Sequence, residues 1–215
     1  DGLYRTSTGF FKIIQMFTGI IECIGTIQSI QKEENNFHFV VASEISTLLK
    51  PDQSVAHDGV CLTVTSCNDK THSVTAIAET ISRTTLGMLQ PGAQMNLERS
   101  LCLGDRLDGH FVYGHVDKLG YLRSVADAGG SRVLEISIGD QDIPLIIEKG
   151  SIAINGVSLT IVDLLPDAFR VAIIPYTWQH TTLSQLKTMD AVNIEFDPIG
   201  KYILRIAGHK ISQPG

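Results

Sequence analysis

Residues 54–63 read Ser54-Val-Ala-His-Asp-Gly-Val-Cys-Leu-Thr63, and the chain repeats them 97 residues later as Ser151-Ile-Ala-Ile-Asn-Gly-Val-Ser-Leu-Thr160. Other matched pairs share this offset or one of 95 residues: Thr84-Thr-Leu86 with Thr181-Thr-Leu183, Asn96-Leu-Glu98 with Asn193-Ile-Glu195, and Gly19-Ile-Ile21 with Gly114-His-Val116. A solenoid repeat spans about 20–50 residues, so this repeat is too long for a solenoid and has the size of a small domain. The sequence therefore predicts two homologous domains.

Short runs of β-branched and aromatic residues, separated by turn residues, dominate both halves of the chain. The expected strands are 37–42, 60–66, 73–78 and 93–97, then 132–138, 157–162, 169–174 and 191–196. Helical patterns of the length that βαβ units require do not separate them, which favours an all-β fold of two small antiparallel barrels. Short helices are expected at 43–49, 84–89, 142–148 and 181–187. Asp197-Pro198 predicts the start of a further helix, with Asp197 as its N-cap.

The expected domain organisation has four parts. Residues 1–15 precede Met16 and lie outside the repeat, so they are expected to be a leader or tag outside the fold. They hold no apolar segment long enough for a signal peptide. The N-terminal barrel is expected at 16–104 and the C-terminal barrel at 105–198, followed by a helix and tail at 199–215. The connection near 99–107 is too short and too apolar for a long flexible linker, so the two domains should be closely coupled.

Composition excludes several classes of partner. The net charge is −6, without a lysine and arginine cluster, which argues against nucleic-acid binding. No apolar run reaches about 18 residues, so we expect no membrane partner. The four cysteines form no CxxC pair or metal-ligand cluster, which favours reduced thiols, a cytoplasmic location and no bound metal.

The repeated box predicts a polar wall. Strand alternation places Cys61 and Thr63 on one face, and Ser158 and Thr160 take the same positions in the second copy. Such hydroxyl groups are either satisfied surface groups or contacts for a neutral, hydrogen-bonding ligand. The chain lacks GxGxxG and GxxxxGK[ST] loops, so a nucleotide phosphate is not the expected ligand group.

The two copies differ where chemistry is expected. His115 replaces an aliphatic residue, Ile20, beside a repeated glycine, and a histidine there can move a proton near neutral pH. Asp197 is expected either to cap a helix or to orient a substrate. We expect His110 to make a strand-end hydrogen bond and His180 to lie on the surface.

Several motifs, in order, resemble those of riboflavin synthase. They are Met16-Phe-Thr-Gly-Ile-Ile21, the box at 54–64, Asn96-Leu-Glu-Arg99, Gly109-His-Phe-Val-Tyr-Gly-His-Val-Asp117, Gly156-Val-Ser-Leu-Thr160 and His180-Thr-Thr-Leu183. The resemblance runs from Met16 to about Arg205. It implies two six-stranded Greek-key barrels that each bind one lumazine, a C-terminal helix that helps to build a homotrimer, and an association with lumazine synthase.

The resemblance also implies a reaction. The family converts two molecules of 6,7-dimethyl-8-ribityllumazine into riboflavin and 5-amino-6-(D-ribitylamino)uracil, the final step of riboflavin biosynthesis. A four-carbon unit moves from one lumazine to the other, without a metal or cofactor. The active site is implied to form between the first barrel of one subunit and the second barrel of a neighbour.

The resemblance further implies which residues act. The first lumazine would be held by Gly19, Ile20, Ile21, Cys61, Leu62, Thr63, Thr75, Ala76, Ile77, Ala78, Glu79 and Thr80. The second would be held by Gly114, His115, Val116, Lys149, Ser158, Leu159, Thr160, Ile174, Pro175, Tyr176, Thr177, Trp178 and Gln179. The implied catalytic roles are proton transfer by His115, substrate orientation by Ser158, Thr160 and Asp197, contact with or activation of the first ring by Cys61 and Ser54, and an important second-residue position at Phe17.

Two alternative functions fit a fold of this kind. Lumazine protein and related antenna proteins bind a lumazine or flavin and catalyse nothing, but they tend to lose the histidine and the hydroxyl wall of one barrel, which this chain keeps. A flavin-dependent oxidoreductase barrel would normally accompany a nucleotide-binding domain, and the chain has no Rossmann motif.

Overall fold

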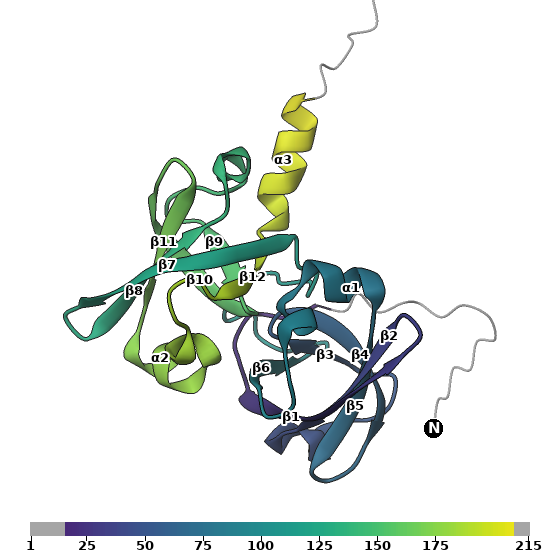
Figure 1. Ribbon diagram of the computed structural model, residues 1–215. Coiled ribbons are helices and arrows are strands. Elements are labelled where there is room, and N and C mark those ends of the chain that lie inside the picture. The colour runs from purple at the N-terminus through teal and green to yellow at the C-terminus, as the bar shows by residue number, and fades with distance from the viewer. Residues whose placement is uncertain (1–15, 209–215) are drawn as a thin grey trace, which may run out of the picture.

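The computed structural model describes residues 16–208, which form two closed six-stranded antiparallel barrels (Figure 1). The strands of the first barrel are β1 (Cys23–Glu33), β2 (Asn36–Ala42), β3 (Ser54–His57), β4 (Val60–Cys67), β5 (Thr71–Ile77) and β6 (Gln94–Arg99). The strands of the second are β7 (Lys118–Ala128), β8 (Ser131–Ser137), β9 (Ser151–Ile154), β10 (Val157–Leu164), β11 (Ala168–Ile173) and β12 (Ala191–Phe196). Around the first barrel the order is β1-β2-β5-β4-β3-β6, and the second barrel repeats this order with each strand number raised by six. The predicted all-β fold of two homologous barrels is confirmed.

Short helices close the barrels and are partly those predicted. The first barrel carries η1 (Glu44–Leu48), α1 (Ala78–Arg83) and η2 (Thr85–Met88), and the second carries η3 (Asp140–Leu145), α2 (Pro175–His180) and η4 (Thr182–Gln185). The sequence analysis did not predict α1 and α2, because a helix of six residues is too short to show a helical period. The expected strands also leave out β1, β3, β7 and β9. The outer halves of β1 and β7 are mostly exposed, and β3 and β9 have only four residues each, so none of them shows a clear alternating apolar pattern.

Each barrel has its own apolar core, built from the inward residues of its strands. Ile27, Phe39 and Val41 belong to the first core, and Leu122 and Leu134 belong to the second. Since inward and outward side chains alternate along each strand, the outer faces remain available for other contacts.

Two tight turns join the barrels back to back. Asp58 and Gly59 connect β3 to β4, and Asn155 and Gly156 connect β9 to β10, all with positive φ. A Cβ atom on Gly59 would lie 2.7 Å from the backbone nitrogen of Gly156, so the turns meet at a distance that only glycine permits.

Two buried asparagines extend this interface symmetrically. Asn96 donates from Nδ2 to the Asn155 carbonyl at 2.9 Å, and Asn193 donates from Nδ2 to the Asp58 carbonyl at 2.8 Å. Asn193 Oδ1 also accepts the backbone N–H of Thr85, in the first barrel. Because these buried groups satisfy one another across the interface, the barrels are closely coupled, as predicted.

Phe17 is a packing residue between the barrels. It is fully buried with Ala56, Val112 and Ala153, and its backbone pairs with that of Val112 at 2.7 and 3.1 Å. The position that the resemblance marked as important therefore has a clear structural role.

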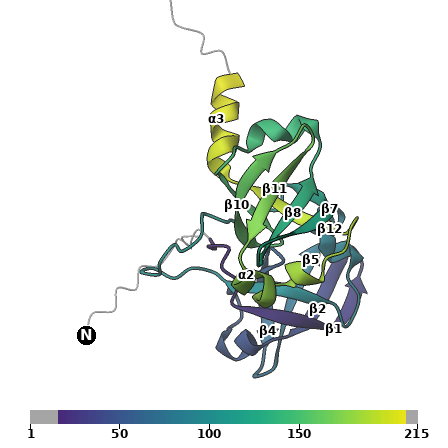
Figure 2. The same cartoon turned by 90° about the vertical axis from the view of Figure 1, so that its left-hand side faces the viewer.

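The last helix, α3 (Pro198–Gly208), leaves the second barrel and projects away from both barrels (Figures 1 and 2). Its start at Pro198 confirms the prediction, and Asp197 caps it by accepting the Ile199 N–H at 2.9 Å. Lys201 fixes its base through an ion pair with Asp117 at 2.8 Å. None of the helices in residues 16–208 has the length and apolar character that crossing a membrane requires.

Candidate active site

Each barrel receives the loop that precedes the other barrel. The Ser158 N–H donates to the Gly19 carbonyl at 2.8 Å, and the Cys61 N–H donates to the Gly114 carbonyl at 2.9 Å. A Cβ atom on Gly19 would lie 2.6 Å from Ser158 Cβ, and one on Gly114 would lie 2.5 Å from Cys61 Cβ. Both glycines also have positive φ, so each loop needs glycine for its conformation and for its close approach.

This crossing changes the expected grouping of the site residues. Ile21 packs against the core of the second barrel, and Val116 packs against the core of the first. From sequence, each loop is expected to form a site with the barrel that follows it. A repeat shows which positions are equivalent, but it does not show which barrel each loop contacts. The structure instead joins Gly19–Ile21 to the second barrel and Gly114–Val116 to the first.

Two candidate sites follow, and we name each by its strand residue. The Cys61 site comprises Cys61, Thr63, Thr75, Ile77, α1 and the loop Gly114–Val116. The Ser158 site comprises Ser158, Thr160, Ile174, α2 and the loop Gly19–Ile21.

Buried glutamates hold both loops in place. Glu98 accepts the Thr18 N–H at 2.7 Å and the Gly19 N–H at 3.0 Å, while Glu195 accepts the N–H groups of Gly114 and His115 at 2.9 and 3.0 Å. Burial raises the pKa of each carboxyl to about 7, although the hydrogen bonds from the N–H donors act to lower this pKa. The sequence analysis noted these glutamates as part of a repeat but assigned them no role. The sequence signal for them is a glutamate at the same position of a mostly apolar strand in both copies.

The outer face of the Cys61 site is polar. Thr63 is exposed and Thr75 is half-buried on neighbouring strands, and Thr75 Oγ1 lies 2.9 Å from His38 Nδ1. His115 is exposed, and its ring stacks loosely on that of Tyr113, with 6.3 Å between ring centres. Its backbone is fixed while its imidazole faces outward, which suits a group that exchanges protons with a ligand.

Other residues predicted for the first lumazine lie in different environments. Leu62 and Ala76 point into the barrel core, so only their backbones are available to a ligand. Ala78 and Glu79 are exposed in α1, where Glu79 pairs with Arg83 at 3.5 Å. Thr80, also in α1, accepts the Thr84 hydroxyl on its carbonyl.

The Ser158 site contains a serine–histidine pair. Ser158 Oγ lies 2.7 Å from His110 Nδ1, and His110 is 8% exposed. His110 Nε2 is buried without a hydrogen-bond partner in the described part of the chain. Burial lowers the pKa of His110, and the charge of Asp197 partly opposes this effect. The sequence analysis had given His110 only a strand-end hydrogen bond, since its partner lies 48 residues away.

The rest of the Ser158 site is more apolar and aromatic. Thr160, Ile174 and Pro175 are exposed, as are Tyr176 and Gln179, whereas Leu159 lies in the core and Trp178 is half-buried against it. The rings of Tyr176 and His180 stack with 4.1 Å between centres. Thr177 accepts the Thr181 hydroxyl on its carbonyl. Lys149 lies at an exposed turn, where its N–H donates to the Ile161 carbonyl.

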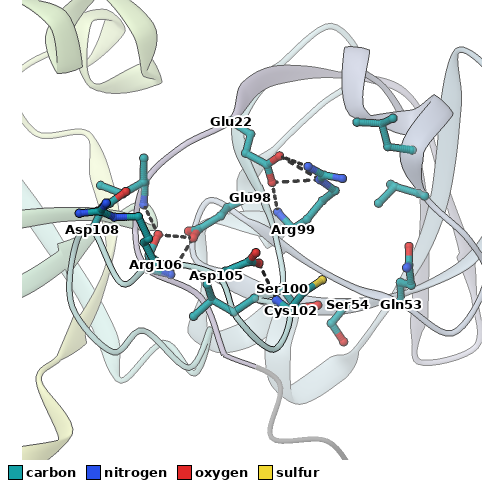
Figure 3. A pocket seen from close by; sticks show the side chains of 15 residues that line it. Glu22, Gln53, Ser54, Glu98, Arg99, Ser100, Cys102, Asp105, Arg106 and Asp108 are labelled. Atoms are coloured by element: carbon teal, nitrogen blue, oxygen red, sulfur yellow. Dashed lines mark hydrogen bonds and ion pairs between the residues drawn. The ribbon is translucent and has the colours of Figure 1, made fainter.

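Ser54 lines a cavity beside the first barrel, which Ile20 of the Gly19–Ile21 loop also lines. This cavity of about 570 Å³ is further lined by Thr18 and Glu98 (Figure 3). Ser54 is 3% exposed, and among the described residues its Oγ has no hydrogen-bond partner. A bound polar group would satisfy it, so the cavity suits a hydroxyl-bearing part of a ligand.

Comparisons with known proteins agree with this geometry. The family described as "Lumazine binding domain" matches residues 18–100 and 113–197. The chain is 41% identical over 192 residues to "Riboflavin synthase" of Actinobacillus pleuropneumoniae, which covers 87% of this chain and 88% of that relative. It is 36% identical over 199 residues to "Riboflavin synthase" of Bacillus subtilis (strain 168), which covers 92% of each. A crystal structure of LumP complexed with riboflavin shares the fold, with a TM-score of 0.78 at 23% identity over 85% of this chain and 100% of that chain.

Proposed function

This chain belongs to the riboflavin synthase family, and from that premise we propose that it converts two molecules of 6,7-dimethyl-8-ribityllumazine into riboflavin and 5-amino-6-(D-ribitylamino)uracil. The observation that carries the proposal is the pair of equivalent sites, each built from a strand of one barrel and the loop of the other. Two equivalent sites suit a reaction whose two substrates are identical molecules.

The differences between the sites suit different roles for the two molecules. The Cys61 site presents an imidazole and a thiol, His115 and Cys61, whereas the Ser158 site presents Ile20 and the pair formed by Ser158 and His110. The same lumazine would therefore meet an exposed imidazole and a thiol in one site, and a hydroxyl group bonded to a buried imidazole in the other. This asymmetry supports a donor and an acceptor of the four-carbon unit.

The chemistry starts with the loss of a proton from the acidic C7 methyl group of one lumazine. The resulting carbanion adds to the other ring, which a nucleophile at C7 activates. We propose that His115 transfers the proton and that Cys61 contacts or activates the ring in its site. Ser158, Thr160 and Asp197 orient the other ring. Ser54 is proposed, with Cys61, to contact or activate the ring at the first barrel. Much of the rate would come from holding two rings in one fixed orientation, because positioning replaces a bimolecular encounter.

We also propose a homotrimer in which α3 contacts neighbouring copies. Ile199, Tyr202, Ile203 and Ile206 on this projecting helix are 60–69% exposed, and an isolated helix of this length is marginal in water. The site would then form between the first barrel of one subunit and the second barrel of a neighbour. A cytoplasmic location is consistent with the cysteines of residues 16–208, which form no disulfide bond. An association with lumazine synthase stays a prediction.

The deciding experiment incubates the purified chain with 6,7-dimethyl-8-ribityllumazine and measures riboflavin formation. Riboflavin accumulation supports the proposal, and tight binding without turnover would identify an antenna protein instead. The variant His115→Gln should lower turnover by about 10²-fold or more, the contribution usual for a proton-transfer group, while lumazine still binds. Unchanged turnover in this variant would remove His115 from the mechanism.

A further inference from the structure

A cavity of about 380 Å³ lies between the two barrels and shares no lining residue with either candidate site. The first barrel lines it with residues of η2 and β6, and the second barrel with residues of η4 and β12. Asp58 and Asn155, in the turns where the barrels meet, are buried at its base, whereas Gln94, Gln185 and Asp190 are exposed at its rim. Because both barrels are needed to form the cavity, a ligand there would bind only the joined, folded form.

The lining of this cavity follows the repeat, but one half of it holds an unsatisfied polar group. Thr85 and Thr182 are equivalent residues of the two copies, and both line the cavity. Thr85 Oγ1 accepts a hydrogen bond from Asn193 Nδ2 at 2.9 Å. Thr182 is only 6% exposed, and its Oγ1 has no hydrogen-bond partner among residues 16–208. A polar group of a ligand in the cavity would satisfy this buried hydroxyl.

Asp58 lies beside Thr182 and has a carboxyl group whose charge the lining does not balance. Asn96 joins the two residues, since its N–H donates to Asp58 Oδ1 and its Oδ1 accepts the Thr182 N–H, both at 2.8 Å. The described residues that line the cavity include no lysine, arginine or histidine. Burial raises the pKa of Asp58 to about 7, although the nearby Thr182 hydroxyl acts to lower it. At pH 8 the carboxylate is therefore ionised, and a bound cation would supply the missing opposite charge.

The rest of the lining indicates which kind of cation fits. A metal ion would need several ligands, and the described part of the chain holds no group of three or more histidine, cysteine, aspartate or glutamate residues placed for one. The cavity is also much larger than a single ion, and much of its wall is apolar. The apolar residues are Met88, Leu89, Ala93, Leu186 and Ala191. An acidic base with apolar walls suits an organic cation whose charge lies at one end of a short aliphatic chain.

We propose that this cavity binds a small aliphatic ammonium ion, which donates hydrogen bonds to the Asp58 carboxylate and to Thr182 Oγ1 while its chain packs on the apolar wall. An ammonium group has three donors and no acceptor, so it can satisfy both oxygens at once. Since the ligand binds only the folded form, it stabilises the joined barrels. The site lies apart from the lumazine sites, and the inference does not depend on the reaction proposed above.

The test titrates the full chain with butylammonium at pH 8, and with 1-butanol as a neutral probe that has the same alkyl chain. The NMR signals of the Asn96 and Thr182 amides report on the cavity, because these N–H groups lie at its base. Butylammonium should shift both signals and reach saturation. The Kd for 1-butanol should be larger by about 10-fold or more, which corresponds to the loss of a charged hydrogen bond.

Variants then identify the groups that bind the cation. Asp58→Asn should raise the Kd for butylammonium by about 10-fold or more, and Thr182→Val should raise it by about 3-fold. Asp69→Asn is the matched control, since it removes the same charge from an exposed turn of the first barrel, and it should leave the Kd unchanged. The Kd of the wild type should rise as pH falls from 8 to 6, because Asp58 becomes protonated. Asp190, the other titratable residue of the lining, is tested by Asp190→Asn, which should keep this pH dependence.

Three results would overturn the proposal: equal Kd values for butylammonium and 1-butanol, an unchanged Kd in Asp58→Asn, or shifts confined to amides outside the cavity. Urea unfolding at pH 8 identifies any variant that fails to fold. The comparison of the two probes and the pH dependence of the Kd use the wild-type chain, so they decide the question even if a variant is lost. Saturating butylammonium should also raise the urea midpoint of the wild type at pH 8 more than that of Asp58→Asn.

Discussion

Replacing Asp58 by asparagine should stabilise the protein above neutral pH. Asp58 is 4% exposed, in the turn where the two barrels meet, and burial raises its pKa from 3.8 to about 7. Its Oδ1 accepts the Asn96 N–H at 2.8 Å. The second barrel makes the same contact with an uncharged residue, because Asn155 Oδ1 accepts the Asn193 N–H at 2.7 Å. The variant Asp58→Asn therefore copies a geometry that the molecule already uses.

The sign and size of the effect follow from this pKa shift. The folded state holds the Asp58 proton more tightly than the unfolded state, so the free energy of unfolding falls as pH rises from about 4 to about 7. A shift of about three pKa units corresponds to about 4 kcal/mol, which is an upper bound for this loss. Asparagine does not titrate, so the advantage of Asp58→Asn should be small near pH 4 and reach its full size by pH 8.

The assay is urea unfolding of the wild type and Asp58→Asn at pH 5, 6, 7 and 8. The other buried acids, Glu98 and Glu195, are present in both proteins, so their titration cancels in the difference. Asn155→Asp is the mirror variant, and it should lose stability over the same pH range. A stability difference between Asp58→Asn and the wild type that does not change with pH would refute the reasoning.

Two further predictions concern the core and the crossing loops. Burial lowers the pKa of His57 to about 3 and that of His72 to about 4, so the stability they contribute is present above about pH 6.5 and is lost as pH falls toward 4. Replacing them by isoleucine and phenylalanine, the residues at these positions of the second barrel, should reduce the fall of the urea midpoint between pH 7 and pH 4.5. A variant whose urea midpoint falls as much as that of the wild type would contradict this. Gly114→Ala would place a methyl group 2.5 Å from Cys61 Cβ at a residue with positive φ. It should lower the free energy of unfolding, measured with urea, by about 1–3 kcal/mol, and should weaken lumazine binding, measured by fluorescence titration. Gly129→Ala is the control, since Gly129 also has positive φ but has open space around it, and its effects on both should be smaller.

The repeat made the fold predictable from sequence. Two copies of 54–63 with the same strand and turn pattern implied two copies of one small barrel, and the pairing order confirms this. The helix that starts at Pro198 was also predictable, because capping depends on adjacent residues. The strand, turn and cap patterns behind these predictions each lie within a few neighbouring residues.

The arrangement of the candidate sites was not predictable in the same way. Glu98 binds the N–H of Thr18, 80 residues away, and Ser158 bonds to His110 across 48 residues. A repeat shows which positions are equivalent, but the crossing of the loops depends on how the two barrels pack.

The exchange of loops between the barrels has a consequence for the origin of the chain. A single barrel without its partner would keep its strands, but the loop that precedes it would have no strand of the other barrel to bind. The strand that carries Cys61 or Ser158 would also lose the loop that it contacts. A one-barrel ancestor would complete these loop-to-strand contacts only by forming a dimer with a second copy of itself. Fusion of two such genes would have made that dimer permanent within one polypeptide, and would have freed the two halves to evolve apart.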